Sequence, residues 1–266
     1  MKIAEIQGLT YSVHSRRVLN DISLSVEKGE YIALLGSAQS GKSELVRCLN
    51  ALVRPESGCV TVCGIDATEP KNAKALREKC AMVFGGAREH FVCRTVREEA
   101  AFALRCFGRA TDAVPTALEK VSFRGREDAA LCELTPLDAV RVSIAAAIAT
   151  EPELIVFDNI LSPLSASDRR ELRALIRKLH GDGMSVILTS DNAEDAADAE
   201  RILVMREGKI ISDGNRQEVF SDRTILETAG LAVPFAVRAY FDLLDADVSL
   251  NRIPLTEDEL VEEVCR

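Results

Sequence analysis

The sequence contains no uninterrupted apolar run near the roughly 20 residues that a membrane-spanning helix needs. Residues 1–5 lack the apolar core of a secretory signal peptide. The eight cysteines include no C-x-x-C pair, and together with the three histidines they form no zinc-ligand pattern. We therefore expect a cytosolic chain whose cysteines are reduced thiols, most of them small core residues.

Basic residues are fewer than acidic ones, 33 against 42. The net charge is −9, whereas a surface that binds nucleic acid needs clustered Lys and Arg to displace counterions from phosphates. We therefore expect no nucleic-acid partner. Residues 241–266 contain two basic and eight acidic residues, a net charge of −6, and this pattern is typical of a solvated helix face.

One local pattern points to a ligand. Residues 36–43 fit the phosphate-binding loop pattern G-x-x-x-x-G-K-[ST]. The apolar run Tyr31–Leu35 before them predicts a buried strand, and Leu45, Leu49 and Leu52 after them recur at helical spacing. The predicted nucleotide-binding residues of this loop are Gly36, Ser37, Ala38, Gln39, Ser40, Gly41, Lys42 and Ser43.

Each conserved feature of that pattern has a physical purpose. Gly36 and Gly41 let the backbone curl so that N–H groups point at phosphate oxygens, and the following helix offers its positive N-terminal end. Lys42 reaches the β and γ phosphates, and the Ser43 hydroxyl completes a Mg²⁺ shell. We expect ATP and Mg²⁺ as ligands. The alternative, a glycine-rich turn that fits by chance, is disfavoured by the strand and helix on either side.

The remaining apolar runs predict one large α/β domain with appendages, for which 266 residues and 47% hydrophobic content suffice. Short β-prone runs around the loop predict an antiparallel β edge. They occur at residues 3–6, 12–13, 22–26 and 58–62. Strand patterns at 80–84 and 154–158 flank a helical stretch, 97–149, which predicts a helical subdomain inserted into the sheet domain.

After residue 158 the pattern alternates between helix and strand, which indicates a parallel sheet with helices on its faces. The helical segments are 168–180 and 194–199, and the strands are 185–189 and 201–205. A hairpin at 205–210 and a mostly helical tail follow, with Thr256 and Glu259 as a capping pair for the last helix.

This order of elements resembles that of the ATP-binding cassette ATPases over nearly the whole chain. The matching segments are Met82–Phe84, Thr95–Phe102, Arg141–Ala145 and Leu154–Asp158, with Tyr11 upstream. In the tail, Gly230–Pro234 and Leu255–Leu260 resemble the C-terminal extension of the A components of energy-coupling factor transporters.

The resemblance implies an α/β fold of the P-loop NTPase (RecA-like) type, with a parallel sheet core, an antiparallel β edge, an inserted helical subdomain and a helical C-terminal extension. The expected cassette domain is 1–215, with its core at 1–85 and 150–215 and the helical subdomain at 86–149. Residues 216–266 are the expected extension, which we interpret as a dimerisation element.

The resemblance also assigns site residues. Tyr11 takes the place of the aromatic that stacks on adenine, and Asp158 that of the carboxylate that anchors Mg²⁺ through water. Three catalytic positions depart from the family. Asn159 stands where a glutamate polarises the attacking water, Gly85 where a glutamine touches Mg²⁺, and Ser190 where a histidine senses the γ-phosphate.

A neutral amide at position 159 can hold a water but cannot accept its proton, and a general base contributes roughly 10²- to 10⁴-fold in rate. Ser190 is too short to replace an imidazole. The family signature L-S-G-G-Q reads Leu134–Asp138 here, where Pro136 lacks an N–H and Asp138 adds negative charge near the partner's triphosphate. The dimer-contact aspartate of the family is Ser165.

The resemblance therefore implies a subunit that binds ATP·Mg²⁺ with weak hydrolysis, on the cytoplasmic face of the membrane. Its expected partners are a second, more complete ATPase subunit in a heterodimer, a transmembrane T component and a substrate-binding S component. Two alternatives stay open. One is an active ATPase with Asp191 or Glu194 as an unorthodox base, and the other is a soluble regulator without a role in transport.

Overall fold

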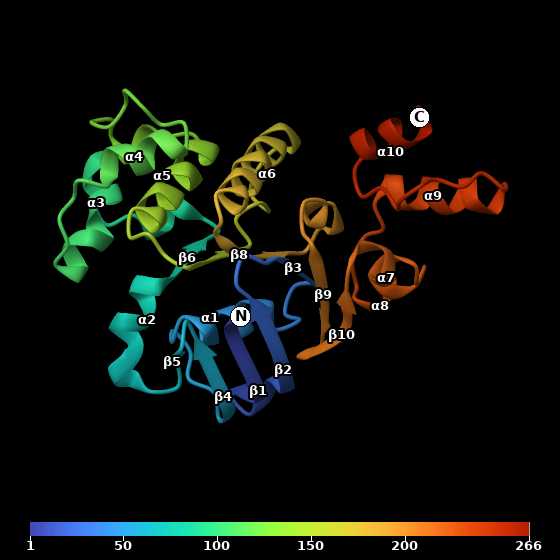
Figure 1. The fold of residues 1–266 in the computed structure, drawn as a ribbon, viewed down its shortest axis with the longest axis horizontal. Coiled ribbons are helices and arrows are strands. Elements are labelled where there is room, and N and C mark those ends of the chain that lie inside the picture. The colour runs from blue at the N-terminus through green and yellow to red at the C-terminus, as the bar shows by residue number, and fades with distance from the viewer. Residues whose placement is uncertain (266) are drawn as a thin grey trace.

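The computed structural model describes residues 1–265, and its centre is a six-stranded sheet in the order β10-β9-β3-β8-β7-β6 (Figure 1). The strands are β3 (Tyr31–Leu35), β6 (Cys80–Phe84), β7 (Leu154–Asp158), β8 (Ser185–Ser190), β9 (Arg201–Arg206) and β10 (Lys209–Gly214). All neighbours are parallel except β10, which pairs antiparallel with β9. Every residue of β3, β7 and β8 is buried, as expected for strands covered on both faces.

A second, antiparallel sheet has the order β2-β1-β4-β5. It contains β1 (Lys2–Val13), β2 (Arg16–Glu27), β4 (Ser57–Val62) and β5 (Ile65–Asp66). The first two strands are longer than the apolar runs that predicted them, because the ladder between them continues through irregular register shifts, one of them between Ile6 and Leu9 around Gly8. Such bulges break the alternation of apolar and polar residues that marks a strand in sequence.

Helices cover both faces and one end of the central sheet (Figure 1). They are α1 (Lys42–Leu49), α2 (Ala73–Lys79), α3 (Val96–Phe107), α4 (Val114–Lys120), α5 (Pro136–Ile148), α6 (Ala166–Gly181), α7 (Arg216–Phe220), α8 (Ile225–Thr228), α9 (Phe235–Asp245) and α10 (Glu257–Val264). Single 3-10 turns are η1 (Pro70–Asn72), η2 (Ala87–His90), η3 (Leu131–Glu133) and η4 (Ala193–Ala196). The helix expected at 194–199 is only η4.

Three apolar clusters hold these layers together. The first joins α3, α4 and α5 to one side of the central sheet, and the second joins the other side to α1 and the antiparallel sheet. The third packs α7, α8, α9 and residues 253–255 against β3 and β9. Strand alternation explains the division, because Ile32 and Leu34 enter the second cluster while Ala33 and Leu35 enter the third.

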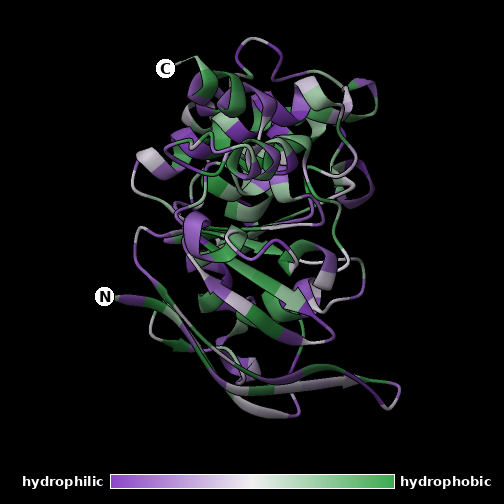
Figure 2. Cartoon of the chain, turned by 90° about the vertical axis from the view of Figure 1, so that its right-hand side faces the viewer, coloured by the Kyte–Doolittle hydropathy of each residue, from purple (hydrophilic) through white to green (hydrophobic). Residues whose placement is uncertain are grey.

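Figure 2 shows the apolar strands of the central sheet enclosed between layers in which hydrophilic residues are frequent. The predicted fold class is therefore confirmed: a parallel α/β core carries an antiparallel β edge, an inserted group of helices and a helical C-terminal segment. Among the residues that the structure describes, no helix has the length and apolarity that a membrane crossing requires.

Candidate nucleotide site

The predicted phosphate loop connects the end of β3 to the start of α1. At Gly36 a Cβ would lie 2.6 Å from the Met205 carbonyl oxygen, so no side chain fits there without a backbone shift. Gly41 has φ 101°, and a Cβ on it would lie 2.8 Å from the Val18 carbonyl oxygen. Both glycines are thus required by close backbone approach, and they leave the N-terminus of α1 facing the loop without a side-chain cap.

Lys42 lies inside the loop. Its ammonium donates to the carbonyl oxygens of Gly36 at 2.6 Å and Ser37 at 2.9 Å. Burial lowers the pKa of Lys42, and the carboxylates of Asp191, Asp158 and Glu44 oppose that shift. The side chain is therefore a positive charge held at the loop by weak acceptors, which phosphate oxygens can replace.

Ser43 and Asp158 meet although 115 residues separate them in sequence. The Ser43 hydroxyl donates to Asp158 Oδ1 at 2.8 Å, and the Thr189 hydroxyl donates to the same oxygen at 3.0 Å. A guanidinium nitrogen of Arg47 lies 3.6 Å from Asp158 Oδ2. Sequence reasoning missed Thr189 and Arg47. The latter lies one helical turn beyond Ser43, a spacing that places both on one face of α1.

The oxygens gathered here fit Mg²⁺. Ser43 and Asp158 supply hydroxyl and carboxylate oxygens, which this cation prefers. Asn159 Oδ1 is buried and has no hydrogen-bond partner among residues 1–265. A Mg²⁺ ion with its water shell would satisfy such an acceptor, so these residues would hold the metal.

Asn159 and Gly85 are in direct backbone contact. Asn159 has a left-handed φ of 55°, and its N–H donates to the Thr189 hydroxyl at 3.0 Å. The Gly85 N–H donates to the Asp158 carbonyl at 2.8 Å, and a Cβ at position 85 would lie 2.6 Å from the Asn159 carbonyl oxygen. The conformation of the 159 backbone therefore leaves no room for a side chain at position 85.

Ser190 contacts the phosphate loop through its backbone, because its carbonyl oxygen accepts from the Gly36 N–H at 3.3 Å. It is buried, and its hydroxyl donates to Asp195 Oδ2 at 2.5 Å. Asp195 also pairs with Arg169 of α6 at 2.8 Å. The serine at the sensor position thus belongs to a network that fixes η4 to α6.

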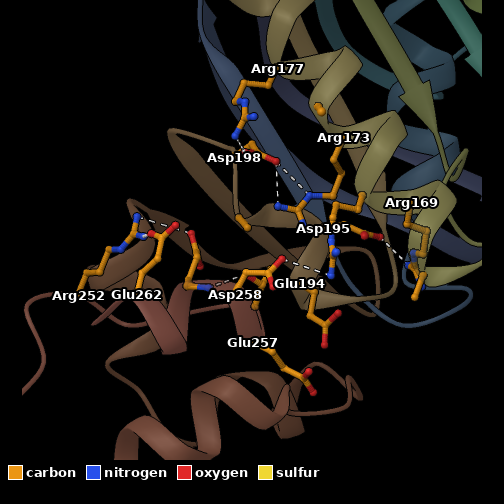
Figure 3. Close-up of a pocket in the computed structure, with 16 residues that line it drawn as sticks. Arg169, Arg173, Arg177, Glu194, Asp195, Asp198, Arg252, Glu257, Asp258 and Glu262 are labelled. Carbon is orange, nitrogen blue, oxygen red and sulfur yellow. Dashed lines mark hydrogen bonds and ion pairs between the residues drawn. The ribbon is translucent and has the colours of Figure 1, made fainter. Parts of the chain in front are cut away.

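A cavity of about 730 Å³, separate from the phosphate loop, lies between α6, η4 and α10 (Figure 3). Figure 3 shows Asp198 facing Arg173 and Arg177, and Glu194 among the residues around this space. Of the two alternative bases, Glu194 therefore lines a different cavity, whereas the charge of Asp191 acts on Lys42.

The site itself opens into a cavity of about 530 Å³, which we call the Asp158 cavity. Its walls are Ser43, Arg47, Leu52, Val53, Phe84, Gly85, His90, Asp158 and Asn159. Tyr11 is outside these walls, half-buried on β1 opposite Leu19 of β2. Because the Val18 carbonyl touches the loop at Gly41, the β1–β2 hairpin that carries Tyr11 borders the phosphate loop.

A family model described as ABC transporter matches residues 19–162, a span that contains the phosphate loop, Asp158 and Asn159. The chain belongs to the ABC transporter family. Similar curated proteins are the energy-coupling factor transporter ATP-binding protein EcfA1 of Halalkalibacterium halodurans and the cobalt import ATP-binding protein CbiO of Syntrophus aciditrophicus. The first is 32% identical over 98% of this chain and 95% of its own length, and the second is 34% identical over 96% and 91%.

Among solved structures, cbiO1 of Clostridium perfringens, part of an ABC transporter complex, superposes with a TM-score of 0.78. It is 22% identical and the alignment covers 92% of this chain and 99% of that one. This likeness shows the cassette fold, and the curated relatives show that the resemblance to energy-coupling factor ATP-binding proteins extends along the chain.

Asp138, at the position of the ABC signature, takes part in ion pairs. Thr135 caps α5 by accepting from the Asp138 N–H at 3.1 Å, and Pro136 opens the helix. The sequence predicts that Asp138 adds negative charge at this position. In the structure its carboxylate pairs with Arg126 at 2.9 Å and with Arg141 at 3.7 Å, and these ion pairs compensate part of that charge.

Proposed function

We propose that this chain is the nucleotide-binding subunit of an energy-coupling factor type importer for a vitamin or a transition metal. It binds ATP·Mg²⁺ and hydrolyses it weakly or not at all at its own site. The observation that carries the proposal is made at the end of β7. Asp158 is hydrogen-bonded to Ser43, so the pair expected to bind Mg²⁺ is present, but the next residue is Asn159, which cannot act as a base. The similarity to an energy-coupling factor ATP-binding protein and to a cobalt import ATP-binding protein supports the transport role.

The residues divide the work of binding among them. Loop N–H groups and the α1 N-terminus receive phosphate oxygens, Lys42 neutralises charge, and Tyr11 stacks on the adenine. Mg²⁺ would be held by Ser43 and Asp158 and would neutralise phosphate charge. The Asn159 amide orients a water by hydrogen bonds and leaves its proton in place, which forgoes about 3 to 5 kcal/mol of barrier lowering.

The proposal includes partners. A second ABC ATPase subunit completes a heterodimer, and a T component docks where α3, α4 and α5 meet the Gly85–Gly86 loop. The S component selects the cargo, and the assembly places this chain on the cytoplasmic face of the membrane. Residues 1–215 act as the cassette and 216–266 as a dimerisation element. That segment exposes five large apolar side chains, which belong to Phe235, Leu244, Val248, Val261 and Val264.

Binding and turnover test the proposal separately. We expect the purified chain to bind ATP·Mg²⁺ at micromolar concentration and Lys42→Ala to abolish the binding. Hydrolysis is then measured for the chain alone and mixed with its candidate partner cassette. No hydrolysis by the chain alone, together with hydrolysis by the mixture, supports a subunit that holds nucleotide. Absence of ATP binding by the wild-type chain contradicts the proposal.

One observation favours a second candidate function, an ATPase with Asp191 as base. Asp191 is exposed, and its charge acts on Lys42. Steady turnover by the unmixed chain that disappears in both Asp191→Asn and Asp158→Ala would replace the first proposal. If turnover disappears in Asp158→Ala but persists in Asp191→Asn, Asp191 is not the base.

A further inference from the structure

His90 shares the Asp158 cavity with Ser43 and Asp158. We propose that His90 is a nucleotide-contacting residue whose imidazole binds the terminal phosphate of ATP·Mg²⁺. The proposal rests on the proposed nucleotide-binding function and adds a residue to that site. In the family pattern this contact is expected from position 190, where Ser190 faces Asp195 instead.

The location of the terminal phosphate follows from the loop. In P-loop proteins the lysine reaches the β and γ phosphates and the hydroxyl after it binds the Mg²⁺ that bridges them. Ser43 and Asp158 both line the Asp158 cavity, so the γ end of the nucleotide is directed into that space. His90 is the only histidine among its walls.

The other two histidines of the chain are placed elsewhere. His180 Nε2 lies 2.8 Å from the Gly29 carbonyl oxygen, and its ring contacts Tyr31. His14 is in the turn between β1 and β2. In the part of the chain that the structure describes, the ring nitrogens of His90 have no hydrogen-bond partner, so they are available to a ligand.

Packing holds the His90 ring at the cavity. Its centroid is 5.3 Å from that of Phe84, the last residue of β6, and the two planes are inclined by 45°. The contact restricts the imidazole although His90 is exposed on the short turn η2. A restrained donor loses less side-chain entropy on binding than a free one.

The charged residues at the Asp158 cavity and on η2 do not prevent an anion from binding beside His90. Arg47 of α1 and Asp158 of β7 face the same cavity, and they pair with each other at 3.6 Å. On η2 itself, Arg88 and Glu89 are the other charged residues.

The helix α5 also packs against η2. Its charged side chains, Asp138 and Arg141, are held in ion pairs with Arg126 and Glu171. His90 therefore faces the Asp158 cavity with no carboxylate bonded to it among the described residues.

The test compares two nucleotides that differ by the phosphate in question. Isothermal titration of the full chain with MgATP and with MgADP is the measurement. For His90→Ala we expect MgATP affinity to fall about tenfold, the size of one hydrogen bond to a charged phosphate oxygen, while MgADP affinity is unchanged.

Arg88→Gln is the matched control, because it removes a positive charge from the same turn and its side chain is outside the cavity wall. We expect it to keep the wild-type ratio of MgATP to MgADP affinity, and His90→Gln to keep part of it. An unchanged ratio in His90→Ala, or an equal loss in Arg88→Gln, overturns the assignment. If the wild-type chain binds neither nucleotide, the proposed function fails and the assignment fails with it.

Discussion

Backbone conformation and catalysis favour different residues at position 159. Asn159 has a left-handed backbone and follows Asp158, the carboxylate that we expect to bind Mg²⁺. Asparagine tolerates the left-handed region better than other residues with a Cβ. We predict that Asn159→Glu raises ATP turnover by about 10²-fold in the complex of this chain with its candidate partner cassette, because the glutamate supplies a general base. It should also lower the free energy of unfolding by about 1 kcal/mol through backbone strain.

Phosphate release and thermal melts of the same preparations measure both effects. Asn159→Asp is the matched control, because it introduces a carboxylate that tolerates the same backbone but is one methylene shorter. Turnover that is equal in the wild-type, Glu and Asp chains would show that something other than the missing base limits this site.

Position 85 makes a second residue-scale prediction. A Cβ there would lie 2.6 Å from the Asn159 carbonyl oxygen, closer than real contacts allow, so Gly85→Ala should force a backbone shift that costs about 1–3 kcal/mol of stability. Gly181→Ala is the control, since a Cβ there meets nothing within 4 Å at the end of α6. Urea unfolding of both variants is the measurement, and equal midpoints would contradict the close contact.

At the scale of elements, the sequence predicted what is local. The phosphate loop was predictable because its glycines, lysine and flanking apolar run are consecutive, and strands such as β7 were predictable from continuous apolar runs. The contact of Thr189 with Asp158 was not, because it exists only through the parallel register of β7 and β8. The roles assigned to these residues in nucleotide binding remain predictions.

The segment after β8 shows why local pattern can mislead. Its alanines and carboxylates predict a helix at 194–199, but a helix of that length is marginal on its own. In the structure Asp195 and Asp198 bind arginines of α6, and the segment forms only the turn η4. Tertiary ion pairs, which the sequence order does not reveal, therefore set this conformation.

The anchoring of η4 is testable. Asp195 is 2% exposed and accepts from both Arg169 and Ser190. Asp195→Asn leaves the Arg169 charge without its counterion, so we predict a loss of about 3–5 kcal/mol in the free energy of unfolding. Asp128→Asn breaks an exposed pair with Arg97 and should change stability too little to detect. Urea unfolding decides, and similar losses in both variants would argue against the anchor.

At the scale of the whole molecule, two of the eight cysteines, Cys48 and Cys80, are buried and report on core integrity. The expectation that most cysteines are core residues is wrong, because four of them are exposed. Burial raises the pKa of Cys48 and of Cys80 from 9.0 to about 12. These thiols contribute stability that is fully present below pH 9 and declines as the pH rises toward 12, because only the unfolded chain ionises them in that interval. At pH 8 we predict that iodoacetamide labels Cys59, Cys106, Cys132 and Cys265 and spares the two buried thiols until the chain unfolds.

Peptide mass mapping of the labelled protein, with and without urea, is the measurement. Labelling of Cys80 at the same rate as Cys59 in the native protein would mean that the edge strand β6 opens readily.

The packing of residues 216–266 indicates that residues 1–215 do not fold independently of them. Phe220, Ile253 and Leu255 of this C-terminal segment are buried in the third cluster against Leu35 and Val204 of the central sheet. Each large apolar side chain buried there contributes about 1.5–3 kcal/mol, and a domain has only about 5–15 kcal/mol of net stability. A chain that ends at residue 215 should therefore aggregate or unfold.

A chain that ends at residue 256 keeps that cluster and loses only α10, whose strongest links to the rest are ion pairs such as Arg216 with Glu259 and Arg170 with Asp258. We predict that this shorter chain stays folded and binds ATP·Mg²⁺ like the full chain but melts at a lower temperature. The exposed Arg170–Asp258 pair contributes little, whereas loss of Glu259 leaves the largely buried Arg216 without this partner. Gel filtration, thermal melts and nucleotide titration of both truncations provide the comparison. If the chain of 215 residues melts like the full one, residues 216–266 form a separable unit, and the apolar contacts across the third cluster contribute little to the stability of the cassette.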